Sequence, residues 1–175
     1  LATCRANLDA FPVADQIAST LVSMQVIEHL WNLAGFLRES LRVLQPGALC
    51  VLSTPNRLTF SPGLKRGDKP TNPFHVEEFD ADQLVGLLRA AGFADVEMFG
   101  LQHSDGLRRW EAQHGDIVAA QIAAAIGGDP SLTEDRQLAA AVARVSTADF
   151  RIDSTKLADC ADLIVVARKP ALAQP

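Results

Sequence analysis

The chain has 175 residues, of which 48% are hydrophobic and 21% charged, values typical of one globular domain with a sizeable core. The net charge of −5 argues against a nucleic-acid partner held through phosphate contacts. We expect no membrane span, because no apolar run approaches the roughly 20 residues that cross a bilayer, and no signal peptide. The three cysteines are widely spaced and outside CxxC pairs, which argues against a zinc site or a disulfide framework and favours a reducing cytoplasm.

Residues 21–25, an apolar run with one polar break at Ser23 that ends at Gln25, and the continuous apolar run 48–53 predict two fully buried strands. Residues 30–44 between them repeat leucine at helical spacing, and the Gln-Pro-Gly at 45–47 ends this helix. Strand, helix and strand in this order predict a parallel βαβ unit with a right-handed crossover. The carboxyl ends of such strands meet at the sheet edge where α/β proteins bind ligands.

A polar loop rich in proline and glycine follows over residues 58–79, and loops of that length are usually either functional lids or disordered. Asp80 is the expected N-cap of a helix over residues 81–91, and Gly92 is its expected C-terminal stop. The sequence therefore predicts a second amphipathic helix directly after the long loop.

Residues 94–102 alternate between apolar and polar, which predicts a less buried strand. Residues 104–145 are mostly helical by composition, with two alanine-rich segments. Residues 162–168 form the last buried strand, and residues 169–175 are expected to be a tail.

Three pieces of the chain, VSMQVIEHL, LRVLQPGALCVLSTPNR and FHVEEFDADQLVGLLRAAGFADVE, occur in an order and spacing that resembles class I S-adenosylmethionine-dependent methyltransferases. The resemblance implies a Rossmann-like α/β sheet of parallel strands with an antiparallel last strand, and S-adenosylmethionine as cofactor. STPNRLTFSPG followed by NPFH looks like actinobacterial enzymes that methylate glucose units of a polysaccharide. The implied reaction is O-methylation of a saccharide or other small molecule.

The family's glycine-rich GxGxG loop and its ribose-binding acidic residue are not in this sequence, which starts just before the position of the fourth strand. The resemblance therefore implies a single partial methyltransferase domain over residues 1–175, with residues 104–145 as a helical insertion. We expect the isolated chain to hold the cofactor weakly. The apolar edge of residues 21–25 favours self-association, for example as a homodimer.

The resemblance places three residues beside the cofactor. Asn7 and Leu8 stand where the family contacts the adenine ring, although an ordinary Asx turn explains the same residues. Gln25 stands where the family lines the cofactor near its sulfonium, and a polar cap on the strand end is an equal alternative.

Methyl transfer to a hydroxyl benefits from a base near neutral pKa, and histidine is the natural one. His29 is the best-placed candidate, and His75 in the long loop is the second; both have a structural alternative. Glu28 is expected to orient His29 or to bind a cation. Related enzymes bind a divalent metal through Glu-x-x-Glu-His, but the first position here is Gln25, so we predict no metal site and regard Mg²⁺ as improbable.

Other histidines and the two tryptophans receive weaker interpretations. His103 and His114 are interpreted as structural or substrate-facing. Trp31 and Trp110 either stack on a sugar face or, in the case of Trp31, belong to the core. Two competing functions stay open at this point: a non-catalytic methyltransferase-fold module that binds partners through residues 104–145, and a disfavoured half of an NAD-type dehydrogenase.

Overall fold

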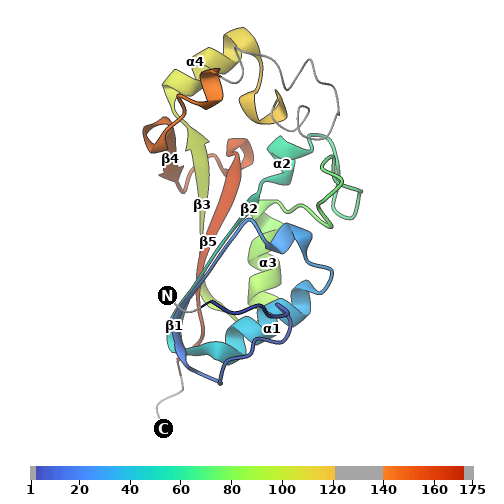
Figure 1. The fold of residues 1–175 in the computed structure, drawn as a ribbon, viewed down its shortest axis with the longest axis vertical. Coiled ribbons are helices and arrows are strands. Elements are labelled where there is room, and N and C mark those ends of the chain that lie inside the picture. Colours follow the sequence, from blue (N-terminus) through green and yellow to red (C-terminus); the bar gives the residue numbers. More distant parts are fainter. Residues whose placement is uncertain (1–2, 121–139, 172–175) are drawn as a thin grey trace.

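A mixed five-stranded sheet forms the centre of the computed structural model, which describes residues 3–120 and 140–171 (Figure 1). The strand order is β1-β2-β5-β3-β4. β1 and β2 are parallel, β5 runs antiparallel to both β2 and β3, and β4 is antiparallel to β3. The strands are β1 (Ala18–Met24), β2 (Leu44–Pro55), β3 (Ala94–His103), β4 (Phe150–Asp153) and β5 (Asp162–Arg168).

The predicted βαβ unit is confirmed, because β1 and β2 are adjacent and parallel and α1 (Leu33–Val43) connects them. This helix begins three residues later than predicted. The Asn32 side chain accepts a hydrogen bond from the Gly35 backbone (3.0 Å), and this N-cap fixes the first turn. The residues before the cap form a separate 3₁₀ turn, η1 (Ile27–His29).

The apolar core lies between one face of the sheet and two helices, α1 and α3 (Ala81–Ala91). The strands were predicted to be buried on both faces, and this is wrong for β1. In the described part of the chain, Val22 and Met24 on its other face are 60% and 49% exposed. The fully buried members of the core are Ile27, Phe36, Leu44, Cys50, Leu52, Phe79, Leu84, Leu88, Cys160, Leu163, Val165 and Ala167.

The predicted start and end of α3 are both confirmed. Asp80 caps the helix by accepting a hydrogen bond from the Gln83 backbone (2.8 Å), and Gly92 ends it in the left-handed conformation (φ 105°). The loop before this helix contains one short helix that the sequence did not predict, α2 (Arg57–Phe60). Its Arg57 forms an ion pair with Asp80, which fastens the two ends of the loop together.

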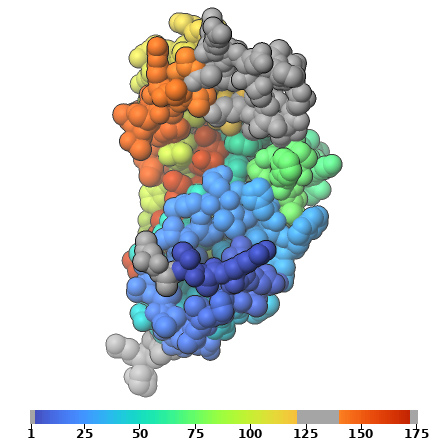
Figure 2. Space-filling model, viewed as in Figure 1, coloured from blue at the N-terminus to red at the C-terminus, as the bar shows by residue number. Residues whose placement is uncertain are grey.

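The upper end of the molecule in Figure 1 combines α4 (Asp105–His114), η2 (Thr147–Asp149) and η3 (Leu157–Asp159) with β4. Residues 117–120 and 140–142 are also helical, whereas 121–139 of the expected insertion lie outside the described residues. β4 was not predicted, since it is a four-residue edge strand. Figure 2 shows this end above the blue N-terminal segment. Within the described ranges, no helix combines the length and apolarity that a membrane crossing requires.

Candidate functional site

The site lies where β1 and β2 end, at the edge that the sequence predicted. Gln25 follows β1 in the left-handed conformation (φ 55°), and its backbone N–H donates to the Ser53 carbonyl of β2 (3.0 Å). This bend turns the chain from the strand directly into η1. Glu28 and His29 consequently stand just beyond the carboxyl ends of two parallel strands, where ligands bind in this class of fold.

Glu28 is almost completely buried, with 1% exposure. The Thr54 hydroxyl at the end of β2 donates to its Oε2 atom (3.1 Å). Its backbone carbonyl accepts hydrogen bonds from the N–H groups of Val76 (2.7 Å) and Glu77 (3.3 Å). The carboxylate is thus held by β2, and its backbone holds the long loop against η1.

His29 has a half-exposed side chain (45%) and one committed nitrogen. Its Nδ1 lies 2.8 Å from the Phe74 carbonyl, an acceptor only, so Nδ1 carries the proton and donates it. Nε2 is then the basic nitrogen, 3.6 Å from Oε1 of Glu28. This arrangement lets Nε2 accept a proton, and Glu28 stabilises the imidazolium that forms.

His75 packs edge-on against His29, with the ring centroids 4.9 Å apart, but its environment is different. Its Nδ1 donates to Oε1 of Glu78 (2.7 Å), and its Nε2 accepts from the Asn72 side chain (3.0 Å). The His75 side chain is 5% exposed and that of Glu78 is fully buried. Glu78 is therefore the buried hydrogen-bond partner of His75 and is closed off from solvent.

A family model described as a methyltransferase domain matches residues 5–98, more than half of the chain. The chain belongs to this methyltransferase family. The matched residues contain β1, η1, β2 and α3, and therefore include Glu28, His29 and His75.

Two mycobacterial relatives have similar sequences. A probable S-adenosylmethionine-dependent methyltransferase of Mycobacterium tuberculosis (strain ATCC 25618 / H37Rv) is 47% identical over 171 residues, covering 95% of this chain and 60% of the relative. Its counterpart in Mycolicibacterium smegmatis is 42% identical over 168 residues, covering 94% and 63%. The chain therefore spans somewhat less than two thirds of the length of these relatives.

Solved structures with the same fold are more distant in sequence. A SAM-dependent methyltransferase of Thermotoga maritima superposes with a TM-score of 0.60 at 13% identity, covering 94% of this chain and 62% of that one. The cyclase SpnF superposes with a TM-score of 0.52 at 22% identity, covering 95% and 55%. At these identities the likeness shows the methyltransferase fold, and SpnF illustrates that the fold is also found in a cyclase.

The residues that the family resemblance assigns to the cofactor lie in two places. Gln25 is exposed at the end of β1, beside Glu28, and its side-chain N–H donates to the Ser53 hydroxyl (3.3 Å). Asn7 and Leu8 form an exposed turn near the amino-terminal end, closed by a hydrogen bond from the Ala10 N–H to the Asn7 carbonyl (3.2 Å). No hydrogen bond within the described ranges joins this turn to the histidines.

Glu28, His29 and His75 could in principle share a metal ion, because each offers a ligand atom and these atoms lie within 4.8 Å of one another. Two imidazoles and a carboxylate suit Zn²⁺ or Mn²⁺ better than Mg²⁺. In the observed arrangement, however, both nitrogens of His75 are engaged by Glu78 and Asn72. Only Glu28 and Nε2 of His29 are placed to coordinate without rearrangement.

Asp162, the first residue of β5, belongs to the same edge, and sequence reasoning missed it. Burial, together with the Glu28 charge, raises the pKa of this carboxyl to about 6, against the opposing effect of a hydrogen bond from Gln25. Thr54 was also missed as a ligand of Glu28. Both stand at strand ends on the predicted edge, which is the only sequence feature that points to them.

Proposed function

We propose that this protein is an S-adenosylmethionine-dependent methyltransferase that methylates a hydroxyl group of a saccharide or another small molecule. The family match and the two mycobacterial relatives support methyl transfer and this cofactor. The observation that carries O-methylation is His29: a half-exposed imidazole with Nδ1 committed to a carbonyl and Nε2 beside a buried carboxylate.

A hydroxyl group is a weak nucleophile at neutral pH, so its methylation requires that its proton be removed as the new bond forms. S-adenosylmethionine supplies the activated methyl group. When bound, the cofactor would give this methyl group to the acceptor oxygen with cleavage of its carbon–sulfur bond, and Nε2 of His29 would take the hydroxyl proton. The products are the methyl ether, S-adenosylhomocysteine and a proton that His29 releases to water.

Other residues have supporting roles in this proposal. Glu28 holds the imidazole and stabilises its charged form, and His75 fixes the ring plane of His29 by edge-on packing. Gln25, Asn7 and Leu8 are proposed to hold the cofactor. Their exposed amides and apolar side chain suit its polar and adenine portions.

The experiment is a transfer assay with isotopically labelled S-adenosylmethionine and three classes of acceptor: neutral saccharides, phenols and amines. Labelled methyl ethers from hydroxyl acceptors, and their loss in His29→Ala, support the proposal. Labelled amines alone would show N-methylation instead. Cofactor binding without transfer to any class would favour the non-catalytic module.

A further inference from the structure

A polar cavity lies at the same end of the sheet, beyond His29 and His75. Its volume is about 230 Å³. It is bounded by α2, the end of β3, α4 and the segment that leads into β5. Its titratable lining side chains are His103, Arg108, Glu111, Asp116 and Asp159, and they stand beside the Phe60 ring.

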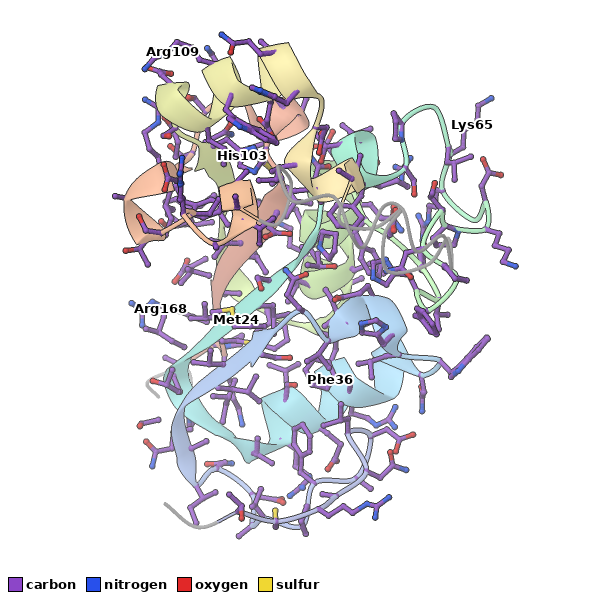
Figure 3. All side chains as sticks on the ribbon, turned by 45° about the horizontal axis from the view of Figure 1, so that its top comes forward. Met24, Phe36, Lys65, His103, Arg109 and Arg168 are labelled. Carbon is purple, nitrogen blue, oxygen red and sulfur yellow. The ribbon has the colours of Figure 1, made fainter. Side chains whose placement is uncertain are left out.

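Two of these side chains are held in place before any ligand arrives. Glu111 binds Nδ1 of His103 (3.0 Å), so Nε2 is the nitrogen that remains for a ligand. The Arg108 guanidinium donates from Nε to the His103 carbonyl and from Nη2 to the Gln102 side chain (both 3.0 Å), leaving Nη1. Figure 3 shows His103 beneath α4, inside this upper end of the molecule. Such preorganisation is characteristic of binding sites.

The charges in the cavity indicate what it binds. Arg108 offers a donor at Nη1, and His103 offers an acceptor at Nε2, because its Nδ1 donates to Glu111. Glu111, Asp116 and Asp159 offer carboxylates, and Phe60 adds an aromatic ring. An anionic ligand would meet the three carboxylates. Neutral hydroxyl groups can donate to the carboxylates and accept from the guanidinium at the same time, so a hydroxyl-rich ring fits this mixture.

The cavity adjoins the proposed catalytic edge through two short contacts. The Phe60 ring lies 6.1 Å from His75, centroid to centroid, and His75 in turn packs on His29. Asp162 pairs with Pro55 at the end of β2 on one side and with Leu101 of β3 on the other, so this residue lies between the two sites. The buried Asn56 fixes α2 by donating to the Cys160 carbonyl (3.0 Å), so Phe60 is rigidly placed.

From these observations we infer that the cavity is a distal subsite for the acceptor. It binds a neutral hydroxyl-rich ring that neighbours the part of the acceptor whose hydroxyl group reacts at His29. Sites for whole drug-sized ligands occupy about 300–1,000 Å³. A cavity of about 230 Å³ therefore takes one ring rather than the complete acceptor. The inference rests on the proposed function only for the reacting end of that acceptor.

The test is an NMR titration of the protein with maltose, sucrose and lactose, and separately with inorganic phosphate, while the His103 imidazole resonances are followed. Arg108→Gln and Asp159→Asn remove one donor and one acceptor from the cavity. Arg109→Gln is the matched control, because Arg109 is the exposed neighbour on α4 and points away from His103 in Figure 3.

We expect saturable shifts of His103 with at least one disaccharide, and affinity about tenfold lower in Arg108→Gln and Asp159→Asn but unchanged in Arg109→Gln. No saturable shift, equal affinity in all four proteins, or Arg108-dependent binding of phosphate alone would overturn the inference. The binding measurement needs no cofactor, so its failure is separable from the transfer assay. Intact disaccharide binding without transfer of the labelled methyl group to any hydroxyl acceptor would instead refute only the proposed function.

Discussion

The pairs Glu28–His29 and His75–Glu78 lie side by side, yet they are built differently. The His29 ring is half exposed and its Nε2 is 3.6 Å from its carboxylate, whereas His75 is buried and bonded at both nitrogens. A base must be reachable and must have a nitrogen that is not already committed. The difference favours His29 as the base and His75 as the residue that positions it.

The largest expected effect is that of His29→Ala. Loss of a general base lowers turnover by about 10²-fold or more, while cofactor affinity changes little because the imidazole is not proposed to hold the adenosyl group. Initial rates at saturating substrate measure turnover, and calorimetry measures the affinity for the cofactor.

His114→Ala is the matched control for this change, because His114 ends α4 and stacks on Trp110, with ring centroids 4.7 Å apart. Its turnover should stay within about twofold of the wild type. A loss of less than twofold in His29→Ala, together with a large loss in His75→Ala, would reverse the assignment of the base.

The pH dependence of the unfolding free energy tests the protonation of Asp162, which lies at the same sheet edge as Glu28. Asp162 has its pKa raised from 3.8 to about 6 by burial and by the Glu28 charge. The folded state therefore holds this proton more tightly, and the stabilisation is complete below pH 3.8 and lost as the pH rises through about 6. The shift corresponds to about 3 kcal/mol as an upper value.

Between about pH 4 and 6, the unfolding free energy measured with urea should change less with pH in Asp162→Asn than in the wild type. Other groups titrate in the same range, so the difference between the two proteins isolates Asp162. Glu39 acts in the opposite sense, because Arg42 lowers its pKa to about 2. If the unfolding free energy depends on pH in the same way in Asp162→Asn and the wild type, then Asp162 is solvated and the Glu28 charge does not raise its pKa.

His75→Ala should mainly reduce stability. It removes the donor to the buried Glu78 and the acceptor for Asn72, at a cost of about 2 kcal/mol. Turnover should fall by about tenfold or less, since only the packing on His29 is lost. Urea unfolding and initial rates distinguish this pattern from that of His29→Ala. A stable His75→Ala protein with abolished turnover would show that His75 acts chemically.

Much of the fold could be predicted from the sequence, because its cues are local. Continuous apolar runs identified β1, β2 and β5, and Asp80 with Gly92 marked both ends of α3. β4 was missed because a four-residue edge strand with Ile152 65% exposed has too little periodicity. The burial of β1 on both faces was wrong, since an apolar run does not say which faces are covered.

The site was predictable where its residues follow a strand or lie in the long loop, but the contacts between them were not. Glu28 and His29 are adjacent and follow a strand, so their position was correct. Thr54 binds Glu28 across 26 residues, and no periodic pattern reports such a pair. Trp31 was expected to stack on a ligand or join the core, and it is 91% exposed because α1 starts only at Leu33.

The smallest effect is expected from removal of metal ions. A chelator should change turnover by less than about twofold, because Asn72 and Glu78 occupy both nitrogens of His75 and leave an incomplete ligand set. Asn72→Ala sharpens this test, since it frees Nε2 of His75 for a metal. Calorimetry should then detect tighter Zn²⁺ binding in Asn72→Ala than in the wild type. Equal and tight Zn²⁺ binding in both proteins, with turnover lost on chelation, would mean that the two histidines act together on a metal and not as base and support.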